Sequence, residues 1–139
     1  MKKLLNIILL TIFTSNSLSA KNINLQEGIN LFENKKYEDA KFKFEKEIVY
    51  NPKSETSYLY LSKIFKNLEN KKLQEQNLNT VLLLNPRNEE AIFNLANLKL
   101  ESSDYKKSKE LNDSLLSLCK NFCNESKKLK IEIDNLSKK

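Results

Sequence analysis

The chain has 139 residues, a formal net charge of +6, no histidine, one glycine and two prolines. This length fits one domain or a short array of repeats, and the shortage of turn-forming residues disfavours a β-sandwich and favours helices. Without histidine the chain lacks the common general base and the commonest metal ligand, and one glycine is too few for a glycine-rich phosphate loop. We therefore expect no enzyme, no cofactor and no metal site. Nucleic-acid binders rely on arginine, and since Arg87 is the only arginine, we expect no nucleic-acid partner.

The N-terminus has the three parts of a secretory signal peptide. Two lysines form a basic start, an apolar run follows from Leu4 to Phe13, and small residues end the segment at Ala20. We interpret residues 1–20 as a cleavable signal peptide, with Ser19 as an alternative cleavage point, and expect a periplasmic or secreted protein. The apolar run is well short of the roughly 20 residues that span a bilayer. The alternatives are an uncleaved N-terminal anchor, which would bring the protein to a membrane, and a helix of the fold.

A period of 34 residues runs through the rest of the chain. Pro52 and Pro86 are 34 positions apart and each follows an asparagine, while Tyr37 and Tyr105 are two such periods apart. A period of this length is typical of stacked helical repeats, each built of two amphipathic helices and a turn. We place three repeats at residues 21–54, 55–88 and 89–122.

The first helix of each repeat has a small residue at the eighth position of the repeat, where two helices approach closely. These residues are Gly28, Ser62 and Ala96. The second and third of these helices also carry apolar residues at helical spacing, which predicts one buried face. The residues are Tyr58, Leu61 and Phe65, then Ile92 and Leu95, with Lys99 in the last place. Ser54 and Asn88 precede these two helices and are predicted to be their N-caps.

The second helices are predicted to begin near Tyr37, Lys71 and Tyr105, with Asp104 as the N-cap of the last. A residue before proline is disfavoured in the α conformation, so the Asn-Pro pairs are predicted to end the first two. The inward positions are expected to be Ala40, Phe44 and Ile48, then Leu78, Val81 and Leu82, then Leu115, Leu116 and Leu118.

Residues 123–139 are predicted to form a capping helix and a basic tail. Leu129, Ile133 and Leu136 share one helical face, which predicts a helix from about Asn124 to Leu136. Each repeat of a stack buries its apolar face only against its neighbours, so the last repeat needs a polar-backed cap. The alternative is a fourth repeat cut short.

Together these positions resemble the tetratricopeptide repeat (TPR) pattern of bulky, small and aromatic residues and a proline at set places in each repeat. The first repeat supplies Gly28, Leu31, Tyr37, Ala40, Phe44 and Pro52, the second Tyr58, Leu61, Phe65, Leu78 and Pro86, and the third Ile92, Leu95, Ala96, Tyr105 and Leu115. The departures are Gln74 and Ser108 for the packing alanine, Asn112 for the aromatic residue and Lys120 for the proline. The resemblance implies an all-α fold, a right-handed superhelix of about three helix-turn-helix repeats.

The resemblance also implies a binding surface, because in this family the first helices line a concave groove that accepts a peptide. Carried over by position, the groove residues are Ile29, Phe32, Leu59, Tyr60, Lys63, Lys66, Phe93, Asn94 and Asn97. Exposed aromatic residues beside lysines combine an apolar anchor with charge steering. For Ile29, Leu59 and Phe93 the alternative is that they pack between helices. The expected partner is a protein or peptide.

Cys119 and Cys123 stand between the third repeat and the predicted cap. In an exported protein such a pair is usually a disulfide, which here would hold the cap on the last repeat; the alternative is a redox-active or metal-binding pair.

Our leading hypothesis is an extracytoplasmic adaptor or scaffold, for example in envelope assembly or secretion. Two other hypotheses are a thiol-disulfide or metal/cofactor-maturation accessory that uses the two cysteines, and a membrane-tethered subunit of a larger complex.

Overall fold

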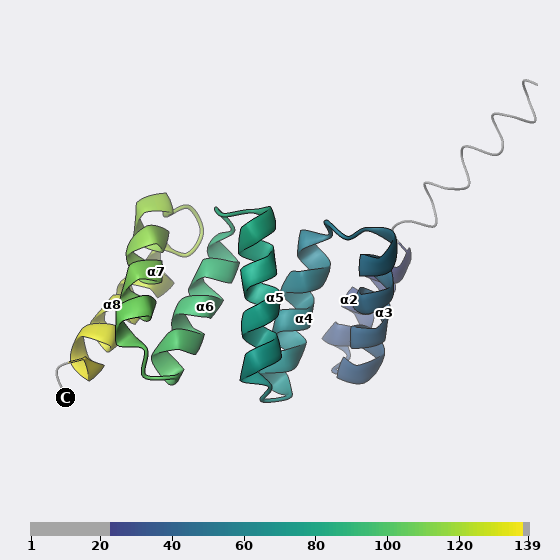
Figure 1. Cartoon of the computed structure of the whole chain (residues 1–139), viewed down its shortest axis with the longest axis horizontal. Helices are drawn as coiled ribbons and strands as arrows, with labels where there is room; N and C mark the ends of the chain where they lie inside the picture. Colours follow the sequence, from purple (N-terminus) through teal and green to yellow (C-terminus); the bar gives the residue numbers. More distant parts are fainter. Residues whose placement is uncertain (1–22, 138–139) are drawn as a thin grey trace, which may run out of the picture. The chain divides into compact units, whose positions relative to one another are not determined.

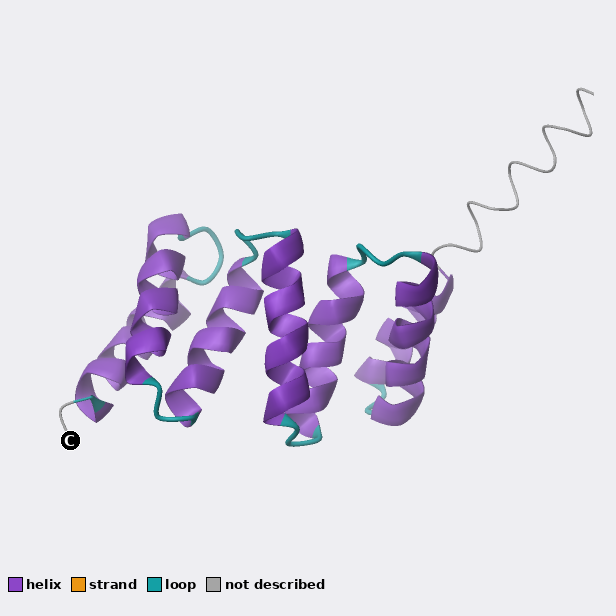
Figure 2. Ribbon diagram, viewed as in Figure 1, coloured by secondary structure: helices purple, strands orange, loops and turns teal. Residues whose placement is uncertain are grey.

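The computed structural model describes residues 23–137, and within this range every regular element is a helix (Figures 1 and 2). The all-α prediction is therefore confirmed for the described residues. The predicted signal peptide at residues 1–20 lies outside them. The helices are α2 (Ile23–Glu33), α3 (Tyr37–Tyr50), α4 (Glu55–Asn67), α5 (Lys71–Leu84), α6 (Glu89–Glu101), α7 (Tyr105–Leu118) and α8 (Cys123–Leu136).

The helix starts follow the predicted caps. Asn88 Oδ1 accepts a hydrogen bond from the Ala91 N–H at 2.8 Å, and Asp104 Oδ1 accepts one from the Lys107 N–H at 3.1 Å. Ser54 Oγ accepts a longer one from the Ser57 N–H at 3.4 Å. Each bond satisfies one of the N–H groups that a helix start leaves without a partner in the helix. The predicted starts of α3, α5 and α7 at Tyr37, Lys71 and Tyr105 are confirmed.

The turn inside each repeat places one non-glycine residue in the left-handed region. Lys35, Glu69 and Ser103 have φ angles of 59°, 55° and 61°, and they are 34 positions apart. At each turn two hydrogen bonds close a Schellman motif, which satisfies the last carbonyl groups of the first helix. The bonds are Lys35 N–H to Phe32 O and Lys36 N–H to Leu31 O, Glu69 N–H to Lys66 O and Asn70 N–H to Phe65 O, and Ser103 N–H to Leu100 O and Asp104 N–H to Lys99 O.

The described residues form two compact units, 23–60 and 61–137, with the boundary inside α4. In the described part of the first unit, α2 packs against α3. A Cβ atom added at Gly28 would lie 2.8 Å from Phe44 Cε1, so only glycine lets the Phe44 ring approach this closely. The Phe44 ring also stacks on the ring of Tyr60, with centroids 5.0 Å apart. The close approach predicted at Gly28 is therefore confirmed.

One hydrophobic core cluster of the second unit joins α6 to α8. Ala96 and Leu100 of α6 pack with Leu129 and Ile133 of α8, and α8 also lies against α7 (Figure 1). Leu136 is partly buried against the same cluster. The predicted apolar face of the last helix therefore faces inward. No helix among residues 23–137 is long and apolar enough to cross a bilayer.

Two departures from the TPR pattern in α7 are buried and hydrogen-bonded. Ser108 Oγ donates to Ala96 O at 2.8 Å. Asn112 Nδ2 donates to Ser126 O at 3.0 Å, and Ser126 Oγ donates to Asn112 Oδ1 at 2.7 Å. Where the first two repeats have Phe44 and Leu78, the third repeat has Asn112. Its hydrogen bonds with Ser126 join α7 to α8, because a buried amide must find partners.

The predicted inward positions of the second helices are only partly confirmed. Ala40, Phe44, Leu78, Val81 and Leu115 are buried, whereas Ile48, Leu82, Leu116 and Leu118 remain partly exposed. The prediction also missed Glu47, which is 1% exposed. In the 34-residue frame Glu47 is equivalent to Val81 and Leu115. The repeat therefore explains why this position is buried, although here the side chain is a carboxylate.

Candidate functional site

The first four groove residues predicted from the sequence belong to the first unit. The ring of Phe32 on α2 meets the ring of Tyr60 on α4 edge to face, with centroids 5.1 Å apart and an interplanar angle of 81°. Ile29, Phe32 and Tyr60 are half-buried, but Leu59 is only 9% exposed and belongs to the core. For Leu59 the packing alternative therefore describes the structure better than a role in direct partner contact.

The other five predicted groove residues belong to the second unit, on the C-terminal half of α4 and on α6. Lys63 Nζ lies 2.7 Å from Glu90 Oε1, so an ion pair links α4 to α6. Lys66 is exposed, and Asn94 is partly exposed. These two side chains are the ones that α4 and α6 offer to a partner without breaking a contact described in the second unit.

Phe93 and Asn97 make more contacts within the protein than the sequence indicated. The Phe93 ring lies 5.4 Å from the ring of Phe122, centroid to centroid, and Phe93 also packs against the core cluster of α6 and α8. Asn97 Nδ2 donates to the Phe93 carbonyl at 2.8 Å. Both residues therefore make packing or hydrogen-bond contacts within the fold. That they contact a partner remains a prediction.

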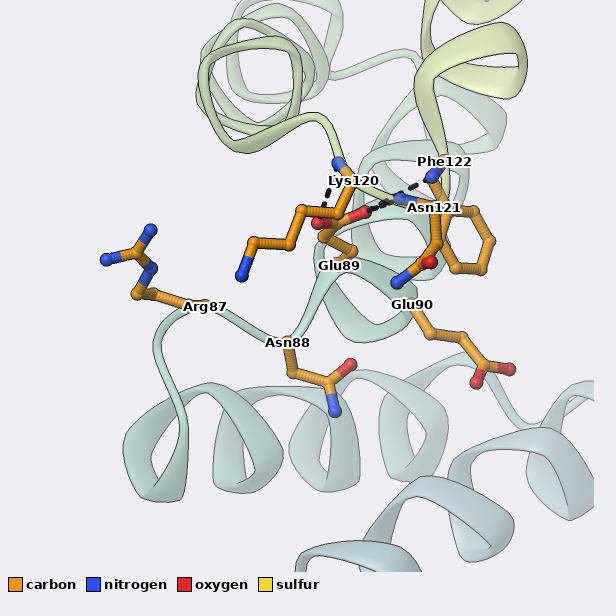
Figure 3. Close-up of a pocket in the computed structure, with 7 residues that line it drawn as sticks. All are labelled: Arg87, Asn88, Glu89, Glu90, Lys120, Asn121 and Phe122. Carbon is orange, nitrogen blue, oxygen red and sulfur yellow. Dashed lines mark hydrogen bonds between the residues drawn. The ribbon is translucent and has the colours of Figure 1, made fainter.

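A concave feature that the sequence did not indicate lies at the N-terminus of α6 (Figure 3). It is an open pocket of about 310 Å³ formed by the α5–α6 connection, the first turn of α6 and the α7–α8 connection. Its lining residues are Arg87, Asn88, Glu89, Glu90, Lys120, Asn121 and Phe122.

The Glu89 carboxylate organises this pocket. It accepts hydrogen bonds from three consecutive backbone N–H groups, those of Lys120 at 3.0 Å, Asn121 at 2.7 Å and Phe122 at 3.1 Å (Figure 3). Donation by the Asn121 N–H holds the pKa of Glu89 below its ordinary value; burial opposes this shift, and the other two N–H groups add to it. Acidic residues in a first helical turn are usually explained by the helix dipole, which is why the sequence did not reveal this role.

The two cysteines bracket the loop that Glu89 binds. Cys119 Sγ and Cys123 Sγ lie 2.03 Å apart, at disulfide distance, with the two Cα atoms 5.0 Å apart. Cys119 follows the end of α7, and Cys123 begins α8. This is the placement expected of a structural bridge between the last repeat and its cap. The redox-active alternative stays a prediction, which a quantitative thiol assay tests.

No protein-family model matches the sequence, and the search of curated proteins finds no match. Solved structures do match. The TPR2B domain of yeast Sti1 in its pHsp70 complex has a TM-score of 0.76 at 14% identity, covering 83% of this chain and 96% of that one. The first TPR of Spaghetti (RPAP3), bound to HSP90 peptide SRMEEVD, has a TM-score of 0.72 at 17% identity, covering 85% and 90%.

A bacterial structure is similar to the same extent. The Yersinia enterocolitica type III secretion chaperone SycD, in complex with a peptide of the translocator YopD, has a TM-score of 0.73 at 15% identity and covers 88% of this chain and 93% of that one. At these identities the likeness concerns the fold. The chain has the fold of TPR domains, as its sequence pattern implied.

Proposed function

We propose that this protein is an interaction module that binds a peptide or protein segment on the surface of its first helices. The observation that carries the proposal is the shared fold, because structures of the same fold have been solved with a peptide bound, as in Spaghetti and SycD. The fold alone does not specify a function, so the proposal also rests on what the surface offers.

The surface of α4 and α6 in the second unit offers one cationic and one amide side chain. Lys66 is exposed and Asn94 is partly exposed. An asparagine amide both donates and accepts hydrogen bonds, which suits the alternating N–H and C=O groups of an extended peptide. A lysine ammonium adds attraction for an acidic partner and raises the rate of encounter.

We further propose an extracytoplasmic setting, for example in envelope assembly or secretion. The support is the sequence of residues 1–20, which has the organisation of a cleavable signal peptide. Mass spectrometry of the native protein tests this. A mature N-terminus at Lys21, or at Ala20 after cleavage at Ser19, supports export with cleavage of a signal peptide. A native protein that retains residues 1–20 contradicts cleavage and favours the membrane-tethered alternative.

Affinity capture with chemical crosslinking tests the binding surface. We compare the wild type with a Lys66→Glu/Asn94→Ala variant and with a matched control, Lys72→Glu/Asn79→Ala, whose changes lie on exposed positions of α5. The proposal predicts that partners are lost in the first variant and retained in the control. Equal capture by all three proteins would place the partner elsewhere.

A further inference from the structure

Two carboxylates line the pocket at the N-terminus of α6, and both already have partners within the protein. Glu89 accepts three backbone hydrogen bonds from the α7–α8 loop, and Glu90 pairs with Lys63 at 2.7 Å. Their negative charges are therefore balanced by donors of the fold itself, and they leave little attraction for an added cation.

The two cations of the pocket are not balanced in this way. Among the described residues, neither the Arg87 guanidinium nor the Lys120 ammonium lies within ion-pair distance of a carboxylate. Lys120 attracts the Glu89 carboxylate only at longer range, and this attraction is the smallest of the causes that lower the pKa of Glu89. Figure 3 shows the Lys120 side chain extending toward the side on which Arg87 lies, whereas Glu90 points to the opposite side. One part of the pocket thus has two cations and no free carboxylate.

Two residues with neutral side chains also line the pocket. Asn121 lines the pocket with a side-chain amide, and Phe122 lines it with a ring that packs on Phe93. Lys120, Asn121 and Phe122 all lie in the short loop between the bonded cysteines, and Glu89 holds the backbone of the same three residues. The disulfide and the three hydrogen bonds fix this loop before any ligand arrives, and preorganisation lowers the entropic cost of binding.

We propose that this pocket binds a carboxylate group of the polypeptide partner, with Arg87 and Lys120 as its cationic ligands. Arginine suits this role because its planar guanidinium forms two parallel hydrogen bonds with one carboxylate. The inference rests on the proposed function, because it assigns the acidic group to the peptide or protein that the module binds. The pocket includes the first turn of α6, but neither Lys66 nor Asn94 lines it, so separate variants test the two surfaces.

NMR titration of the ¹⁵N-labelled, disulfide-intact protein tests the proposal. The probe is acetyl-Glu-Glu-Glu-Glu-amide, with acetyl-Gln-Gln-Gln-Gln-amide as the neutral control and inorganic phosphate as a second anion. We expect the glutamate peptide to shift the amide signals of residues 120–122 in a saturable way, and the glutamine peptide to leave them unchanged.

Two double variants make the test specific. Arg87→Gln/Lys120→Gln is expected to weaken binding of the glutamate peptide about 10-fold or more, since charge-assisted hydrogen bonds are among the stronger ones. Lys72→Gln/Lys106→Gln removes the same charge from exposed positions and is expected to weaken it less than about 2-fold at physiological salt. The amide spectra of both variants verify that they are folded.

Three results would overturn the proposal: equal weakening in both double variants, equal shifts with the glutamine peptide, or tighter binding of phosphate than of the glutamate peptide. In each case the capture experiment with Lys66 and Asn94 still decides the proposed function separately. A pocket that fails while capture depends on those two residues leaves the binding module standing without this site.

Discussion

Replacing Glu47 by leucine should stabilise the protein. The side chain is 1% exposed, and its Oε2 atom accepts no hydrogen bond from any described group. A buried polar group without a partner costs about 1–3 kcal/mol, and more if it is charged. The equivalent residues of the next two repeats, Val81 and Leu115, are apolar and fully buried, so the position accepts an aliphatic side chain.

We expect Glu47→Leu to raise the free energy of unfolding by about 1–3 kcal/mol, which corresponds to a rise in Tm of roughly 4 °C per kcal/mol for a chain of this size. Urea and thermal denaturation followed by circular dichroism measure both quantities. Glu45→Leu, on the exposed side of the same helix, is the matched control and should change stability by no more than about 0.5 kcal/mol. A Glu47→Leu variant that is no more stable than the wild type would refute the reasoning, because it would mean that the carboxylate is well solvated or paired.

Three further predictions concern close packing, the α7–α8 junction and pH. Gly28→Ala should lower stability by about 1–2 kcal/mol, because overpacking against the Phe44 ring outweighs the gain of roughly 1 kcal/mol in helix propensity; a more stable variant in urea denaturation would contradict the contact. Asn112→Ala should cost about 1–3 kcal/mol, and the double variant with Ser126→Ala should lose less than the sum of the single losses, whereas additive losses would mean that the pair is not coupled. The pKa of Glu89 lies below its ordinary value of 4.5, so its ionised form stabilises the fold above that pH and this contribution is lost as the pH falls through the folded-state pKa. The difference in Tm between wild type and Glu89→Gln should therefore shrink when the pH is lowered from 7 to 3, and a constant difference would argue against the three hydrogen bonds.

The repeat period and the local signals at helix ends were enough to predict most of the helix boundaries. Asn88 and Asp104 act as caps within their own helix starts, and such short-range rules can be read from a single sequence. The left-handed turn residues were not foreseen, because glycine usually marks such positions and this chain uses Lys35, Glu69 and Ser103. Here only the period of 34 connects them.

The repeat pattern of the sequence does not predict contacts between residues that are far apart in the chain. Asn112 was recognised as a departure from the family, but its partner Ser126 is on another helix. A glutamate in a first helical turn is ordinarily explained by the helix dipole, whereas the Glu89 carboxylate binds a loop more than 30 residues away. The predicted groove residues lie on the first helices as expected, yet the burial of Leu59 and the packing of Phe93 on Phe122 depend on neighbours that the family pattern does not specify.

Site-specific photo-crosslinking tests the central claim most directly. A benzophenone amino acid is placed in turn at Lys66 on α4, at Asn94 on α6 and at Leu83, which is 82% exposed on α5. The account predicts that Lys66 and Asn94 crosslink to the same partner polypeptide and that Leu83 does not. Crosslinks from Leu83 alone would contradict it and would place the partner on the second helices.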